Sequence, residues 1–156
     1  MSTKQKKERL AYYITPHGFG HAIRSLEVVN QLLLQAPELE IVVVSTIPEF
    51  LFEQNLQRSL SVQARQLDIG LVQQDSLRFD MLATLKGLES LHADRTHLLS
   101  KETNFLETSG IQAVICDIPF LPFAAASQAG ISQITAWIPH VSRKLVSSDT
   151  SWIRSA

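Results

Sequence analysis

The sequence predicts an α/β fold with a Rossmann-like, doubly wound and mainly parallel sheet. Residues 10–14, 40–45 and 111–116 form short apolar runs that are continuous rather than alternating. Such runs are typical of strands that helices cover on both faces. Segments with apolar residues at helical spacing lie between them. Because a helix between two strands carries the chain back to the same end of the sheet, this alternation favours parallel strands with right-handed connections.

The elements follow from where the apolar period changes. Residues 10–14 are aromatic and β-branched, whereas the apolar residues within 21–35 recur at helical spacing. In the long helical stretch further on, we expect a kink or break at Gly87 or within residues 93–96. The sequence predicts strands at residues 10–14, 40–45, 61–68, 111–116 and 132–137, helices at residues 21–35, 47–56 and 121–129, and a broken helical stretch over 81–106.

Two of these elements carry finer predictions. Thr46 and Glu49 match a capping box, which would begin the second helix. In the third strand, Val62, Ala64 and Leu67 are predicted to face inward.

Length and composition allow one domain with a real core. The chain has 156 residues, of which 45% are hydrophobic, and a second domain of similar size does not fit. We expect a disordered basic N-terminus over residues 1–9, one Rossmann-like domain over 10–137 and an irregular tail over 138–156, with a short helix around 141–146.

Charge and cysteine content exclude several classes of function. The net charge of -1 leaves no broad basic face, so nucleic acid is not expected as a partner. The apolar run after the N-terminal basic cluster is too short for a signal peptide or a membrane span, which predicts a soluble, cytoplasmic protein. Cys116 stands alone, which excludes an internal disulfide and a Cys-based zinc cluster. His92 and His97 are five residues apart and do not form a metal pair, so no metal site is predicted.

The turn at residues 17–21 is the candidate binding element. Gly18 and Gly20 permit positive φ and let a ligand approach the backbone. The helix that follows leaves unpaired N–H groups at its positive N-terminal end, which favours an anion or a partly negative ligand oxygen.

Two histidines flank this turn. The positive potential of the helix end disfavours an imidazolium at His21, so a neutral imidazole there can accept a proton from a hydroxyl group. The alternative is that His21 only caps or packs the turn, and His17 can equally be a residue that shapes the loop. Asp117, which follows a buried strand, can orient an imidazole, bind sugar hydroxyls or cap the next helix.

The carboxyl ends of parallel strands meet at one edge of the sheet. The glycine turn, Thr46 after the second strand, Asp75 on the long connection and Asp117 all fall on that edge. We therefore expect them to form one site.

The glycine pattern does not match the common nucleotide-binding motifs. Ile23 stands where a dinucleotide fingerprint needs its third glycine, and no acidic residue ends the second strand. A cofactor-dependent oxidoreductase is therefore disfavoured. No Gly-Lys-Ser or Gly-Lys-Thr occurs, which excludes a phosphate-loop nucleotidase.

Several motifs resemble those of GT-B glycosyltransferases. Residues 13–29 read Tyr-Ile-Thr-Pro-His-Gly-Phe-Gly-His-Ala-Ile-Arg-Ser-Leu-Glu-Val-Val, and residues 41–50 read Ile-Val-Val-Val-Ser-Thr-Ile-Pro-Glu-Phe. Residues 72–77 with Asp80, and residues 114–119, fit the same pattern. Over residues 10–136 the chain resembles the N-terminal half of these enzymes, most closely the glycosyltransferase-like domain of L-arabinokinase and its free-standing bacterial relatives.

This resemblance implies a function and a set of residues. It implies an acceptor-side domain whose sugar donor is a nucleotide-sugar substrate, with no cofactor, and whose acceptor is a sugar or a lipid-linked molecule. By position, His21 would be the base or would position the acceptor, and Asp117 would line the acceptor side. The residues that would bind substrate or phosphate are His17, Gly18, Phe19, Gly20, Arg24, Thr46 and Asp75.

The sequence departs from this family after residue 136. It reads Trp-Ile-Pro-His-Val-Ser-Arg-Lys where relatives of the arabinokinase type have a segment like Asn-Phe-Ser-Trp. We therefore expect a truncated or frame-shifted product, or a half-enzyme that needs a partner chain carrying the donor domain and is inactive alone. The alternative is a non-catalytic module that binds sugar or phosphate, or that regulates another protein.

Overall fold

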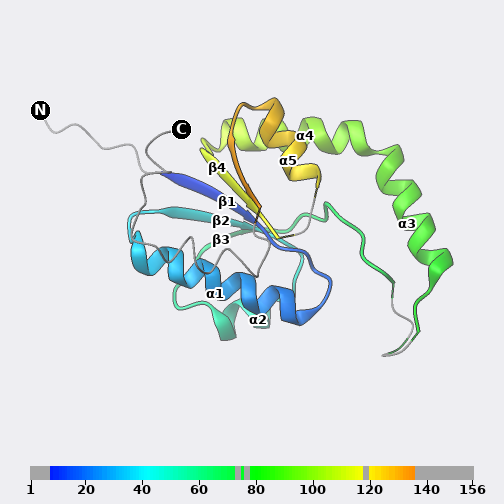
Figure 1. Ribbon diagram of the computed structural model, residues 1–156, viewed down its shortest axis with the longest axis horizontal. Coiled ribbons are helices and arrows are strands. Elements are labelled where there is room, and N and C mark those ends of the chain that lie inside the picture. Colours follow the sequence, from blue (N-terminus) through cyan, green and yellow to red (C-terminus); the bar gives the residue numbers. More distant parts are fainter. Residues whose placement is uncertain (1–7, 73–74, 76–77, 118–119, 136–156) are drawn as a thin grey trace, which may run out of the picture.

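The computed structural model describes residues 8–72, 75, 78–117 and 120–135, and it shows one parallel sheet with helices on both faces (Figure 1). The strands are β1 (Arg9–Tyr13), β2 (Glu40–Val44), β3 (Ser61–Gln63), β4 (Ala113–Cys116) and β5 (Ser132–Thr135), and the helices are α1 (Phe19–Gln35), α2 (Glu49–Asn55), α3 (Met81–Ala93), α4 (Arg95–Thr108) and α5 (Leu121–Gln128). The predicted fold class is confirmed.

The strand order β3-β2-β1-β4-β5 places β1 at the centre of the sheet. Tyr13 pairs with Val44 of β2 on one side and with Cys116 of β4 on the other, so the three strands end level with one another. The chain first builds outward from β1 to β3 and then crosses back to β4. The loops after β1 and β4 therefore diverge at a topological switch point, where ligands of such sheets bind.

Side chains of successive strand residues alternate between the two faces of the sheet. Tyr12 belongs to the core on the α1 and α2 side, whereas Tyr13 belongs to the core on the α4 and α5 side. Figure 1 shows these two helix layers on opposite faces of the sheet. Both tyrosines are almost fully buried, because helices cover each face of the central strand.

Helix α3 stands apart from the two layers (Figure 1). Thr84 is the buried residue of this helix. The predicted break is found at Asp94, between α3 and α4, whereas the helix continues through Gly87. Gly87 instead allows a close approach, since a Cβ there would lie 3.0 Å from Ile69 Cδ1. Within the described residues, no helix combines the length and the apolar character needed to cross a membrane.

Two local predictions are wrong. The third strand is shorter than expected, and Val62 and Ala64 are exposed rather than inward, because β3 is an edge strand. Leu67 is buried as predicted.

The capping box is the second error. Pro48 is the N-cap of α2, without a side-chain cap hydrogen bond. Ser45 shapes this loop instead: its Oγ donates to Ile14 O at 2.8 Å and accepts from Ile47 N at 3.2 Å. Of the N-terminus predicted as disordered over residues 1–9, residues 1–7 lie outside the described residues, whereas Arg9 already belongs to β1. The predicted tail 138–156 also lies outside the described residues.

Candidate functional site

The glycine turn connects the end of β1 to the first turn of α1. Gly18 is the N-cap of α1 with φ of 87°, a conformation that favours glycine. Gly20, by contrast, does not have a positive φ, and a Cβ at Gly20 would meet no atom within 4 Å. No side chain caps α1, and its first turn holds no acidic residue. The helix end therefore keeps its positive potential.

His21 and Asp117 meet at the switch point, as the sequence predicted for residues at this edge. His21 Nδ1 lies 3.3 Å from Asp117 Oδ2. The Asp117 side chain is only 2% exposed, whereas that of His21 is 44% exposed. Neither atom has a well-directed hydrogen-bond partner among the described residues. The pair thus joins a buried carboxylate to an imidazole that solvent or a ligand can reach.

The environment of Asp117 is unfavourable for its charge. Burial raises the pKa of this carboxyl group above its ordinary value, and the negative charge of Asp68 adds to that effect. The charges of His21 and Arg24 act in the opposite direction and lower the pKa. Burial and these neighbouring charges thus oppose one another at Asp117, and burial has the larger effect on its pKa. Asp117 does not cap the next helix, because the N-cap of α5 is Phe120.

His17 is part of the loop structure. Its Nε2 accepts a hydrogen bond from the Gly70 N–H at 2.5 Å. Thr15, two residues earlier, donates its Oγ1 hydrogen to Asp68 Oδ2 at 2.6 Å. The glycine turn is thus attached to residues that follow β3 by two side-chain hydrogen bonds.

Sequence reasoning missed Asp68 and Gly70 as members of this site. Asp68 was placed inside the third strand, and Gly70 in the connection after it. The available signal was the sequence Asp-Ile-Gly itself, a polar residue and a glycine directly after an apolar strand pattern. Because β3 ends at Gln63, this signal falls at the carboxyl edge of the sheet.

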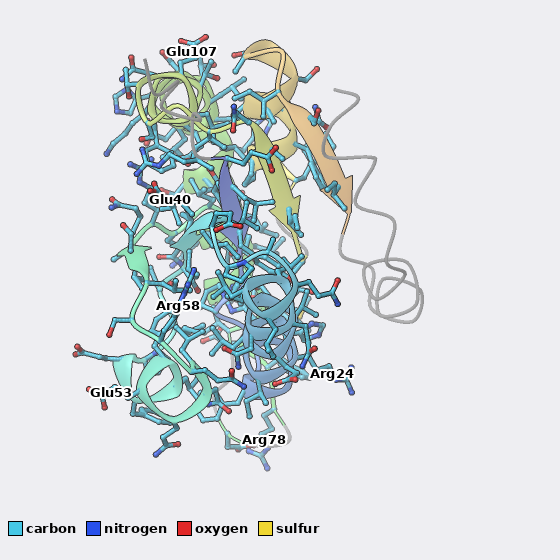
Figure 2. All side chains as sticks on the ribbon, turned by 90° about the vertical axis from the view of Figure 1, so that its left-hand side faces the viewer. Arg24, Glu40, Glu53, Arg58, Arg78 and Glu107 are labelled. Carbon is cyan, nitrogen blue, oxygen red and sulfur yellow. The ribbon has the colours of Figure 1, made fainter. Side chains whose placement is uncertain are left out.

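Phe19 and Arg24 belong to the first part of α1, near His21. The Phe19 ring makes an edge-to-face contact with Phe50 of α2, with the ring centroids 6.0 Å apart, and both rings remain exposed. Figure 2 shows Arg24 projecting outward from α1, away from Glu53 of α2. The positive charge of Arg24 lowers the pKa of Asp117.

Thr46 and Asp75 are less closely tied to the pair. Thr46 is exposed after the end of β2. Asp75 lies on the connection between β3 and α3, where its Oδ1 accepts from the Arg78 N–H at 2.9 Å. The structure thus brings together His21 with Asp117 and His17 with Asp68, and gives Asp75 a partner in its own turn.

Other chemistries find less support. Among the described residues, no group of three or more His, Cys, Asp and Glu residues could hold a metal ion. Cys116 is fully buried, and burial raises the pKa of its thiol, which keeps it protonated and unreactive. His92 and His97 are exposed. A cavity of about 520 Å³ lies at the opposite, amino edge of the sheet, between residues such as Leu10 and Ile134.

Known proteins resemble this chain in sequence and in fold. L-arabinokinase of Arabidopsis thaliana is 36% identical over 136 residues, which cover 86% of this chain and 13% of that protein. The chain thus spans a small part of the length of this relative. No family model matches.

Two solved structures superpose on part of this chain. The glycotransferase of kitacinnamycin superposes with a TM-score of 0.51 at 16% identity, covering 84% of this chain and 30% of that one. MurG of Acinetobacter baumannii gives a TM-score of 0.49 at 19% identity, covering 82% and 34%. The chain is therefore homologous to a segment of L-arabinokinase, and its Rossmann-like fold is similar to that of part of the kitacinnamycin glycotransferase.

Proposed function

We propose that this chain is the acceptor-side domain of a GT-B sugar transferase, with His21 as the base that takes the proton of the acceptor hydroxyl. The observation that carries this proposal is the His21–Asp117 pair, 3.3 Å apart, with its imidazole exposed and its carboxylate buried at the switch point. The homology to L-arabinokinase and the fold of the kitacinnamycin glycotransferase support the class of protein.

The pair divides the work between its two members. Nδ1 of His21 faces Asp117, which leaves Nε2 for the acceptor hydroxyl. As the hydroxyl oxygen forms a bond to the anomeric carbon of the donor, its proton moves to Nε2. The bond from that carbon to the phosphate oxygen breaks, and the nucleoside diphosphate leaves with the electron pair. Asp117 is a positioning residue, which orients the ring and stabilises the imidazolium.

The uncapped end of α1 would serve the donor. Gly18 takes a positive φ at the N-cap of α1, no side chain caps this end, and no acidic residue in the first turn opposes an anion. Arg24 adds a positive charge one turn further along. Such a helix end favours the diphosphate of a nucleotide-sugar. The diphosphate belongs to the nucleotide-sugar substrate itself, so the proposed reaction needs no separate cofactor.

Calorimetric titration with UDP, UDP-sugars and free sugars tests the binding step. We expect wild-type protein to bind at least one of them, and His21→Ala to bind it more weakly. His97→Ala is the matched control, because His97 is an exposed histidine on α4. Equal binding of every ligand by wild type and His21→Ala would contradict the placement of the binding site beside His21, and silence of the folded wild type would contradict the proposed function.

A second assay separates catalysis from binding alone. Sugar transfer is measured with a GT-B donor domain supplied in trans. We expect the wild-type chain to gain activity and His21→Ala to gain none. A chain that binds the nucleotide-sugar but transfers nothing would be a non-catalytic binding module, possessing the anion-binding turn without the reaction.

A further inference from the structure

We infer that Asp68 is a further positioning residue of this site, which holds the glycine turn through Thr15 and places a second negative charge close to Asp117. The inference rests on the proposed function of the His21–Asp117 pair. It concerns a residue 53 positions away from Thr15 in the chain, on the connection from β3 to α3.

The first observation is the direct bond from Asp68 to the turn. Thr15 is 1% exposed, and its Oγ1 donates to Asp68 Oδ2 at 2.6 Å. The same Oγ1 accepts from the His17 N–H at 3.4 Å. Because the hydroxyl is buried, losing its acceptor would leave it unpaired, which costs more than an exposed hydrogen bond. Asp68 therefore fixes the backbone where β1 leaves the sheet.

The second observation is the fit between His17 and Gly70. The imidazole packs so closely on Gly70 that a Cβ there would overlap the ring. The Gly70 N–H donates to His17 Nε2, and Asp68 Oδ1 lies 4.0 Å from the same nitrogen. Asp68 and Gly70 thus contact the side chain of Thr15, just before the turn, and that of His17, its first residue.

The third observation is electrostatic. The charge of Asp68 is close enough to raise the pKa of Asp117. Each histidine of the turn thus has a carboxylate near it, Asp117 at 3.3 Å from His21 and Asp68 at 4.0 Å from His17. A turn held in this way is in place before a ligand arrives, and so less of the binding free energy is spent on ordering it.

Asp68→Asn and Asp68→Ala separate the two roles of this side chain. Asparagine retains an oxygen that accepts from Thr15 but removes the charge, so we expect the pKa of Asp117 to fall, as measured by carbon NMR of its carboxyl group. Alanine also removes the hydrogen bond. We expect it to shift the amide resonances of residues 17–21 and to lower UDP affinity about tenfold, the effect of one charge-assisted hydrogen bond. Asp94→Asn, at the exposed junction of α3 and α4, is the control.

The outcomes distinguish this inference from the proposed function. An unchanged Asp117 titration in Asp68→Asn, or unchanged turn resonances in Asp68→Ala, would overturn the role of Asp68 and leave His21-dependent binding intact. If the wild type binds no UDP, the proposed function fails. The Asp117 titration and the turn resonances then still decide whether Asp68 positions the turn.

Discussion

Among the described residues, two buried carboxylates have basic partners, and they differ in how completely they are enclosed. Glu102 of α4 accepts from Tyr13 Oη at 2.5 Å and from Arg65 Nη1 at 2.8 Å, so each of its oxygens has a partner. Asp117 lies 3.3 Å from His21 without a well-directed hydrogen bond among the described residues. The side chain of Arg65, the basic partner of Glu102, is 22% exposed, whereas that of His21, the partner of Asp117, is 44% exposed.

The difference separates a structural ion pair from a site that can accept a ligand. The Arg65 guanidinium also stacks over the Phe105 ring, 3.9 Å from its centre. Burial, and then the charge of Glu102, raise the pKa of Tyr13, so its hydroxyl remains a donor. The Glu102 network thus satisfies its own members. In the Asp117 pair, by contrast, His21 Nδ1 and Asp117 Oδ2 have no hydrogen-bond partner among the described residues. These atoms lie at the edge of the sheet where ligands of such sheets bind.

Breaking the closed network should have the largest effect. Glu102→Ala leaves the Arg65 charge and the Tyr13 hydroxyl without their partner, and we expect a loss of about 3–5 kcal/mol in the free energy of unfolding. Urea denaturation measures this loss. Glu107→Ala is the control, because Glu107 is exposed on the same helix (Figure 2). A loss no larger than that of the control would mean that the two carboxylates do not differ in the way described.

The glycine turn offers a comparison of two neighbouring glycines. Gly18→Ala forces a side chain into a positive φ, and we expect it to cost about 1–3 kcal/mol of stability. Gly20→Ala has space for its Cβ inside α1, and we expect it to stabilise by up to about 1 kcal/mol. Thermal unfolding of the two variants measures both. Equal effects would show that the turn does not require the conformation at Gly18.

Removing the charge of Asp117 should stabilise the protein slightly, whereas the Glu102 variant loses stability. The pKa of Asp117 is raised above 3.8 in the folded protein, so the folded state holds this proton more tightly than the unfolded chain. Ionisation of Asp117 therefore makes the protein less stable as the pH rises above about 3.8. We expect Asp117→Asn to raise the melting temperature at neutral pH, with the gain disappearing below that value. A variant less stable than wild type at pH 7 would contradict this expectation.

The fold was predictable because its strands and helices have distinct apolar periods. The runs that became β1, β2 and β4 are continuous and apolar, which is the pattern of central strands. The third strand was predicted too long, since an edge strand has fewer buried side chains and its end leaves little trace in the sequence. The break at Asp94 was predictable from a polar stretch, whereas Gly87 was not distinguishable from a helix end by residue type alone.

The site was predictable as far as the topology determines it. His21 and Asp117 follow adjacent central strands, so the rule that carboxyl ends meet at one edge was enough to bring them together. The contacts of Asp68 with Thr15 and of Gly70 with His17 depend on the path of an irregular connection, which no periodicity describes. Asp75 lies on the same irregular connection, and position in the sequence alone predicts it at this edge. Its described hydrogen bond is with Arg78 in its own turn.

The most direct test of the difference between the two carboxylates is a titration of isotope-labelled protein with a UDP-sugar, followed residue by residue by NMR. We predict that the amide resonances of Gly18, Gly20, His21 and Asp117 move with the ligand concentration, whereas those of Arg65 and Glu102 remain in place. Movement centred on Arg65 and Glu102, or none in the glycine turn at saturating ligand, would contradict the assignment of the open pair as the binding site.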